Sequence, residues 1–498
     1  MKKTIETLIV SLSILWGNSP QSAPNSTCDL NRGEINPSSM TLIKNATIIN
    51  PEKKESYPGH LLIEKNKIKK ILKCTILPEL PHSLRQLDRK GQWLLPGLMD
   101  LHVHNWGDNV PPRGAYGEEF HDFVTQEEMG HRMLRAGQTS YLDLFAPSDA
   151  GDNPDKTMGS NIFELRRRQR DQKIVHPNVY VSGPLFVVDG GHSVAGFPDA
   201  ITIKVKDDKG QALSGKDLDK RIREVKSKVK KLIQSRNPNV IKFVYDSHKD
   251  SPISADREDM PLVIAKSIIE EAKANNKKTV AHVGSWKAVG DLAELGLNAF
   301  THLPSGPAPN EVIESLVRNH VSAITTIAIY SDIGLMKNPS EKKSILENTL
   351  LKMISPLSLL VSYWLPELYD ESSKKFADWS AEQNEIESQK QALMSLYKGG
   401  VHLIAGSDGG NVGTIIGYTL HRELLHMEKF GMNRWDVLES ATSHSGRFLD
   451  NNRGVIAEGA IADLIILKKS PLSSISNLQT IESVILGGRA IELEGFEN

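Results

Sequence analysis

The chain has 498 residues, of which 39% are hydrophobic, and its formal net charge is -1 at pH 7. This length exceeds a single typical domain, and the apolar content suffices for a sizeable core. Because charges of both signs are mixed along the chain, the composition gives no sign of a nucleic-acid-binding surface, and we expect no nucleic-acid partner.

The first 25 residues have the layout of a secretory signal peptide. Lys2 and Lys3 precede an apolar segment over 7–16, and small or polar residues follow through Ala23. The apolar segment is too short to span a bilayer comfortably, so we expect no stable membrane span in the mature chain. We therefore expect a periplasmic or secreted protein, with a disordered or membrane-anchoring N-terminus as the alternative.

Cys28 and Cys74 are the only two cysteines of the chain. An oxidising compartment would permit them to form a disulfide. Two cysteines alone do not establish a pair, so the pairing stays open at this point.

Both ends of the chain are rich in predicted strands, whereas the middle alternates between strands and helices. The terminal strands are expected at 41–49, 59–68, 462–467 and 483–491. In the middle, apolar strands followed by helical patterns predict a parallel β/α architecture. Its eight strands are expected at 99–104, 139–145, 179–183, 240–245, 279–283, 299–302, 322–327 and 401–407.

Two further segments of the middle region carry helical patterns. Apolar residues recur at helical spacing in the basic stretch 216–236, which predicts an amphipathic helix with solvated lysines and makes a phosphate-binding surface the less favoured alternative. The stretch 337–397 is longer than an ordinary connection and contains an apolar helical pattern. We expect a helical insertion there, which either folds over the mouth of the β/α barrel or packs only against a neighbouring element.

Two histidines, His102 and His104, end an apolar run that begins at Leu95. Alternate side chains of an extended strand point to the same face, so both imidazoles would face one side, as a metal site requires. With 16 histidines in the chain, roughly 0.5 pairs of this spacing are expected by chance, so the pair needs support from other residues.

That support comes from four residues downstream. Lys242, His282, His302 and Asp408 each lie within or at the end of a short apolar run. The carboxyl ends of parallel strands in a β/α barrel meet at one face, so these side chains are expected to gather with the histidine pair.

The order and setting of these residues resemble the amidohydrolase superfamily of metal-dependent hydrolases. Within it, the chain is similar to the branch of imidazolonepropionase-like enzymes and metal-dependent prolidases, over about residues 41–495. The resemblance implies an α/β fold, with a (β/α)8 TIM barrel at 99–449. It also implies a small β-sandwich built from both chain ends, 41–98 and 450–495.

The resemblance also implies a divalent-metal cofactor, with two zinc ions per chain. One ion would be held by His102, His104 and Asp408, and the second by His282 and His302. A buried histidine without a metal is the alternative for either of the last two taken singly. Nitrogen and oxygen ligands suit zinc but also manganese, cobalt or iron, so the identity of the metal stays open.

Lys242 is the residue that bears on the number of metal ions. Burial can lower the pKa of a lysine and free its neutral amine. In the related enzymes, such an amine reacts with carbon dioxide to form a carbamate that bridges two cations. The alternative is an ordinary lysine whose ammonium group extends to solvent.

Three residues are candidates for catalysis. Asp408 could take the proton of the attacking water and pass it to the leaving nitrogen, and an aspartate that only forms a turn is the alternative for this residue taken alone. His192, in the glycine-rich loop 189–196, resembles a histidine of this branch that polarises the scissile carbonyl, or is merely held by the turn. Tyr245 could donate a hydrogen bond to the same region or serve packing alone.

We therefore expect a metal-dependent hydrolase that cleaves C–N bonds of small amides, dipeptides or cyclic amides with metal-activated hydroxide. The alternatives are a mononuclear deaminase, a phosphotriesterase-like hydrolase and a non-catalytic metal-binding scaffold. The expected partner is a small amide or dipeptide substrate, and the sequence leaves a homo-oligomer open.

Overall fold

The computed structural model describes residues 26–105, 125–145, 161–192, 200–245, 257–334, 347–354, 384–411 and 413–493, together with residues 343, 345, 378 and 380. The predicted signal peptide, 1–25, and most of the predicted insertion, 337–397, lie outside the described residues. None of the helices in these ranges is both long and apolar enough to cross a membrane.

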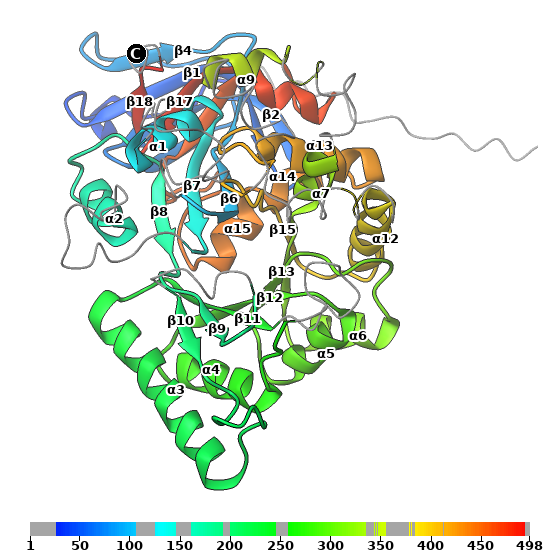
Figure 1. The fold of residues 1–498 in the computed structure, drawn as a ribbon. Helices are drawn as coiled ribbons and strands as arrows, with labels where there is room; N and C mark the ends of the chain where they lie inside the picture. Colours follow the sequence, from blue (N-terminus) through cyan, green and yellow to red (C-terminus); the bar gives the residue numbers. More distant parts are fainter. Residues whose placement is uncertain are drawn as a thin grey trace, which may run out of the picture.

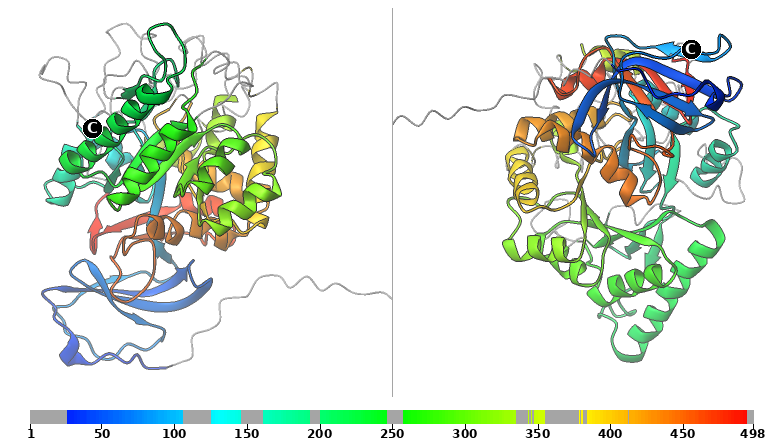
Figure 2. Two further views of the ribbon diagram at one scale, coloured as in Figure 1. Left: turned by 90° about the horizontal axis from the view of Figure 1, so that it is seen from below. Right: turned by 180° about the vertical axis from the view of Figure 1, so that it is seen from behind.

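Strands from both ends of the chain form one sheet, with the order β18-β17-β16-β5-β1-β2-β3 and with β4 paired to β1. The strands are β1 (Met40–Asn50), β2 (Glu55–Glu64), β3 (Lys67–Leu72), β4 (Arg85–Asp88), β5 (Trp93–Pro96), β16 (Leu464–Leu467), β17 (Ile481–Leu486) and β18 (Arg489–Ile491). The antiparallel pairing of β16 with β5 joins the two chain ends. This sheet lies at one end of the molecule, opposite helix α3 (Gly215–Arg236) (Figures 1 and 2).

Two of the predicted terminal strands are each interrupted by a turn. The chain reverses between β2 and β3 at Lys65, whose φ of 55° is in the left-handed region. It reverses again between β17 and β18 at Gly487 and Gly488, with φ of 54° and 78°. The prediction of single strands over 59–68 and 483–491 was therefore wrong, because each segment contains a tight two-residue turn of the kind that favours such backbone angles.

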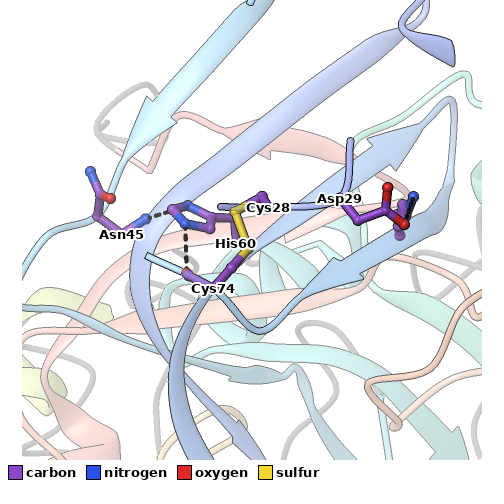
Figure 3. Close-up of a disulfide and its surroundings, with 6 residues drawn as sticks. Cys28, Asp29, Asn45, His60 and Cys74 are labelled. Carbon is purple, nitrogen blue, oxygen red and sulfur yellow. Dashed lines mark hydrogen bonds and ion pairs between the residues drawn. A yellow bond between two sulfur atoms is a disulfide. The ribbon is translucent and has the colours of Figure 1, made fainter. Parts of the chain in front are cut away.

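Cys28 and Cys74 form a disulfide bond that ties the start of the described chain to the segment after β3. His60 of β2 lies beside it, as Figure 3 shows. Its Nδ1 accepts a hydrogen bond from the Asn45 backbone N–H at 3.2 Å, and its Nε2 donates to the Cys74 carbonyl at 3.1 Å. Because both ring nitrogens and both sulfurs are engaged, this buried group is structural and holds no free metal ligand.

The eight segments predicted to form parallel strands in the middle of the chain each contain a strand. These are β6 (Leu98–Val103), β7 (Gln138–Asp143), β8 (Asn178–Val181), β11 (Val240–Tyr245), β12 (Lys278–Val283), β13 (Ala299–Thr301), β14 (Ser322–Ile324) and β15 (Leu403–Ile404). All pair in parallel, β6 to β8 in one sheet and β11 to β15 in another.

Backbone hydrogen bonds connect these two parallel sheets at both edges. Leu101 in β6 donates to Ala405, just after β15, at 3.1 Å, and Asn239, just before β11, donates to Val181 in β8 at 2.7 Å. A buried apolar cluster draws on the same strands: Met99, Leu101, Leu142, Leu144, Val240, Val280, Ala299, Ile324, Ile404 and Phe448.

The sequence did not predict the short strands β9 (Phe186–Val188) and β10 (Ile201–Ile203), which extend the second sheet beside β11. With three residues each, they are too short for a recognisable alternation. They matter for the site because the loop that carries His192 follows β9.

Helices cover the outside of the parallel strands, and α3 to α6 lie along β11 to β13 (Figure 1). The predicted amphipathic helix at 216–236 is confirmed as α3, which buries Val225, Val229 and Leu232. The other described helices are η1 (Arg32–Glu34), α1 (Gln126–Arg135), α2 (Ile162–Arg170), α4 (Leu262–Ala274), α5 (Trp286–Glu294), α6 (Asn310–Arg318), α7 (Ile327–Gly334), α9 (Thr349–Ile354), α12 (Glu385–Lys398), α13 (Thr419–Phe430), α14 (Arg434–Ser440), α15 (Ser443–Phe448) and η8 (Ile475–Gln479).

Candidate metal and active site

His102, His104 and Asp408 form a compact group at the carboxyl ends of β6 and β15. The Nε2 atoms of His102 and His104 lie 3.2 Å and 3.1 Å from Oδ1 of Asp408, and 3.2 Å from each other. One ligand atom from each residue lies within 4.8 Å of the other two. Two imidazole nitrogens and one carboxylate oxygen converging in this way are donors that suit a divalent metal ion.

The imidazole rings are oriented by hydrogen bonds from their second nitrogen. His104 Nδ1 donates to the Phe145 carbonyl at 2.9 Å, which leaves the Nε2 lone pair directed at the group. His102 Nδ1 lies 2.6 Å from Thr301 Oγ1. Such outer contacts fix the ring and its tautomer in metal-binding histidines.

Close ring contacts connect His282, in β12, and His302, directly after β13, to this group. The ring centroids of His282 and His302 are 4.4 Å apart, and those of His302 and His102 are 5.0 Å apart. His302 Nδ1 lies 2.8 Å from Thr326 Oγ1, so its ring is oriented in the same manner as that of His102. The structure thus brings together the five predicted histidine and aspartate ligands.

Two of these residues have an unusual backbone. His302 and Asp408 have φ of 67° and 55°, a region that residues other than glycine rarely adopt. Next to Asp408, the chain approaches β6 closely, because a Cβ on Gly406 would lie 2.8 Å from the Cβ of His102. Strained positions of this kind cluster at functional sites, where the surrounding structure stabilises them.

The side chain of Lys242 lies close enough to Asp408 to feel its charge, and it is 3% exposed. Its Nζ has no hydrogen-bond partner among the described residues. Burial lowers the pKa of Lys242 to about 7, although the nearby charge of Asp408 favours the protonated form. A large fraction of this amine is therefore neutral near pH 7, and a buried amine without a partner calls for a ligand or a modification.

The carboxyl group of Asp408 is held in its charged form. Burial acts to raise its pKa, but the adjacent His102 and His104 hold the pKa well below its ordinary value. Oδ1 faces the histidine pair, whereas Oδ2 accepts a hydrogen bond from the Asn411 amide at 3.2 Å. The carboxylate is thus available both as a ligand and as an acceptor of protons.

Of the remaining candidates, His192 borders this group, whereas Tyr245 packs against the apolar cluster that contains Ile241 and Phe243. The ring centroid of His192 is 4.5 Å from that of His282, so His192 borders the ligand cluster. Its Nδ1 lies 3.3 Å from the Nη1 atom of Arg257. Tyr245 is half-buried at the end of β11, and burial raises the pKa of its hydroxyl.

The sequence analysis missed Thr301, Thr326, Asp100 and Arg257. Asp100 is buried and accepts hydrogen bonds from Ser407 Oγ at 2.6 Å and from the His102 backbone N–H at 3.2 Å. A polar residue inside an apolar strand was the available signal for Thr301 and Asp100. Thr326 gave the same signal within the strand predicted at 322–327, whereas Arg257 follows no such pattern, because only the fold brings it to the ring that it contacts.

Parallel strands that carry clustered imidazoles, a carboxylate and a buried lysine at their carboxyl ends define an α/β protein with a candidate metal centre. The sequence matches the model of the amidohydrolase family over residues 93–491, and the chain belongs to this family. The predicted superfamily is thereby confirmed, and the chain is an enzyme of the class that acts on C–N bonds.

Solved structures share the fold. A prolidase complexed with N-methylphosphonate-L-proline is 19% identical, with a TM-score of 0.67, and the match covers 91% of this chain and 100% of that one. A Xaa-Pro dipeptidase with bound methionine is 18% identical (TM-score 0.66; 91% and 100%), and the ochratoxinase of A. niger is 21% identical (TM-score 0.63; 91% and 95%). No curated protein matches the sequence. At these identities the likeness establishes the fold alone.

Proposed function

We propose that this enzyme uses divalent metal ions to hydrolyse a C–N bond of a small amide, such as a dipeptide or an N-acyl amino acid. The observation that carries the proposal is the convergence of His102, His104 and Asp408, of which His102 and Asp408 interact electrostatically with Lys242, whose buried Nζ has no hydrogen-bond partner among the described residues. Membership of the amidohydrolase family supports the type of bond.

We also propose that the eight parallel strands close into a (β/α)8 barrel over 99–449, and that 41–98 and 450–495 form a β-sandwich domain. The backbone hydrogen bonds at both edges of the parallel sheets and the shared apolar cluster inside them support the barrel. The common sheet of the two chain ends supports the second domain.

The metal ligands follow from the donors present. His102, His104 and Asp408 would hold one ion, and His282 and His302 would hold the second. All are nitrogen or oxygen donors, which suit zinc and also manganese, cobalt or iron, and of these we propose zinc.

Lys242 would connect the two ion sites as a carbamate. Its neutral Nζ attacks the carbon of carbon dioxide, a nitrogen–carbon bond forms, and one proton leaves to solvent. The product carries a negative charge and two oxygens, which a buried amine lacks. The lowered pKa of Lys242 favours this modification, as does the lack of a hydrogen-bond partner for Nζ within the part of the chain that the structure describes.

In the proposed reaction, Asp408 and His192 each have a separate role beside the metal ions. Divalent metal ions, when bound, would supply a nucleophile by lowering the pKa of water toward neutrality. The carboxylate of Asp408 would accept a proton from the attacking water and deliver it to the leaving nitrogen, so that it acts first as base and then as acid. His192 donates a hydrogen bond to the scissile carbonyl. For Tyr245 we propose the packing role, because it packs with Ile241 and Phe243 and not on the face of β11 that carries Lys242.

A small substrate is favoured by the structural neighbours, which include a prolidase and a Xaa-Pro dipeptidase. We propose that the insertion at 337–397, most of which lies outside the described residues, folds over the mouth of the barrel. An enclosed site would strengthen electrostatic interactions with a carbonyl.

We further propose that the chain is exported and loses roughly its first two dozen residues. The disulfide between Cys28 and Cys74 supports this location, because disulfides persist in oxidising compartments. Intact-mass measurement of the native protein tests the proposal, and an uncleaved N-terminus on cytoplasmic protein contradicts it.

The experiment that tests the function is a hydrolysis screen of the metal-loaded enzyme with dipeptides, N-acyl amino acids, lactams, aminopurines and phosphotriesters. We expect a new amine from the first two groups. Ammonia release would favour a deaminase, and preferred cleavage of phosphotriesters would favour that hydrolase class. Bound metal without turnover of any compound would favour a scaffold.

A further inference from the structure

The loop that carries His192 is hydrogen-bonded to the residues that precede helix α4. The backbone N–H of Glu258 donates to the Gly190 carbonyl at 2.9 Å. Gly190 has a φ of 72°, and a Cβ on Gly191 would lie 3.1 Å from the Glu258 carbonyl oxygen. Gly190 therefore permits a left-handed backbone, and Gly191 permits a close backbone approach that a larger residue would hinder.

Side chains strengthen this attachment. The carboxylate of Glu258 forms an ion pair with Lys206, which follows β10. Arg257, the neighbour of Glu258, reaches His192, with Nη1 3.3 Å from Nδ1. Arg257 and His192 are both partly buried. They line a pocket together with Val188, Val244, Glu258 and Met260.

The contact between Arg257 and His192 determines which ring nitrogen carries the proton. A guanidinium group has five N–H donors and no acceptor, so His192 Nδ1 must accept. A neutral imidazole that accepts at Nδ1 carries its proton at Nε2. The ring, whose centroid lies 4.5 Å from that of His282, thus presents an Nε2–H donor at the edge of the ligand cluster.

We propose that Arg257 is a positioning residue that fixes His192 in the Nε2–H tautomer and thereby makes it a hydrogen-bond donor to the scissile carbonyl. This inference rests on the proposed function for its effect on turnover. The tautomer itself does not depend on any substrate. In the other tautomer, Nδ1 would carry the proton and Nε2 would be an acceptor, which repels a carbonyl oxygen instead of stabilising it.

The kinetic test compares single and double variants of the metal-loaded enzyme. We expect Arg257→Met to lower kcat about 10- to 100-fold with KM changed less than about 3-fold, as for other residues that orient a ligand. Arg257→Lys keeps a charged donor and is expected to restore most of kcat. Arg167→Met, which removes an exposed arginine paired with Glu164, is the matched control and is expected to leave kcat unchanged.

The double variant separates action through His192 from direct action on substrate. Because Arg257 acts through His192, adding Arg257→Met to His192→Ala is expected to lower kcat less than about 2-fold further. Multiplicative losses, or a large rise in KM, would overturn the proposal in favour of direct substrate contact.

A measurement without substrate keeps the proposal testable when no turnover is found. In protein labelled with 15N-histidine, with His192→Gln used for assignment, we expect the shift pattern of a neutral Nε2–H imidazole for His192. In Arg257→Met we expect this pattern to be lost or averaged. An Nδ1–H pattern in the unsubstituted protein, or an unchanged pattern in Arg257→Met, would overturn the inference, whereas failure of the hydrolysis screen alone concerns only the proposed function.

Discussion

Lys242 is the residue whose environment departs most from that of an ordinary surface lysine. Its amine is buried, lacks a hydrogen-bond partner among the described residues and has a pKa lowered to about 7. A permanently charged or shorter side chain at this position cannot form the proposed carbamate.

We therefore expect Lys242→Ala to bind less than one equivalent of metal at the second site and to lose at least about 100-fold in kcat. Elemental analysis and turnover measured on the same preparation check this. The control is Lys226→Ala, which removes a surface lysine of α3 that pairs with Glu270 of α4. Unchanged metal content and turnover in Lys242→Ala would remove the lysine from the metal site.

Asp408 provides the second test at the residue scale. Asp408→Asn keeps the shape of the side chain but cannot accept a proton, so we expect kcat to fall about 100- to 10,000-fold. The unfolding transition should remain cooperative, as monitored by circular dichroism. Asp171→Asn, at an exposed aspartate paired with Arg167, should behave as the unsubstituted enzyme. Near-normal turnover in Asp408→Asn would exclude Asp408 from the proton transfer.

The sequence could predict the site residues that lie within or at the end of strands, but not the partners that orient them. His102, His104, Lys242 and Asp408 each lie within or at the end of a short apolar run, and a parallel arrangement of these runs brings their side chains to one face. Arg257 lies outside any strand and reaches His192 only because the two loops are fastened together. Such contacts between loops leave no periodic signal in the chain.

The segment that precedes β1 is held to the segment after β3 by a covalent link. The disulfide closes a loop of 46 residues between Cys28 and Cys74. Replacing both cysteines by serine is expected to lower the free energy of unfolding of this part of the chain by about 2–4 kcal/mol.

Denaturant titration with and without a reducing agent checks this expectation. Reduction should destabilise the unsubstituted protein and leave the double-serine variant unchanged. Turnover should be retained, because the disulfide belongs to the terminal sheet and not to the ligand cluster. Equal stability of the two proteins under oxidising conditions would contradict the structural role of the disulfide.

At the element scale, prediction from sequence succeeded where strands are apolar and separated by helices. The segments at 240–245 and 279–283 are examples, since each is a buried run bounded by polar residues. It failed where a turn interrupts an apolar pattern, as at Lys65, and where strands are as short as β9. Tertiary pairing, and not local pattern, determines such boundaries.

For the whole molecule, buried neutral histidines make stability depend on pH. Burial lowers the pKa of His176 and of His421 to about 4, from an ordinary value of 6.5. The folded state thus favours the neutral rings, so their contribution to the free energy of unfolding is fully present above pH 6.5. It is lost as the pH falls from 6.5 to about 4, by about 3 kcal/mol for each ring.

His421→Gln tests this dependence. Glutamine can still donate to the Ala136 carbonyl, which His421 Nε2 contacts at 2.8 Å, but it does not titrate. Urea titrations at pH 7 and pH 4 should show a loss of unfolding free energy smaller by about 3 kcal/mol in the variant. An identical loss in both proteins would show that His421 is not the titrating group.

The most direct test of the whole account is turnover of a dipeptide by enzyme stripped of metal and titrated with zinc. In the proposed mechanism, five imidazole and carboxylate ligands and one lysine would hold two ions per chain, and hydrolysis would require both. We predict no turnover in the stripped enzyme and a linear rise that ends at two equivalents of zinc per chain. Turnover without metal, or a plateau at one equivalent, would contradict the binuclear amide hydrolase proposed for this fold.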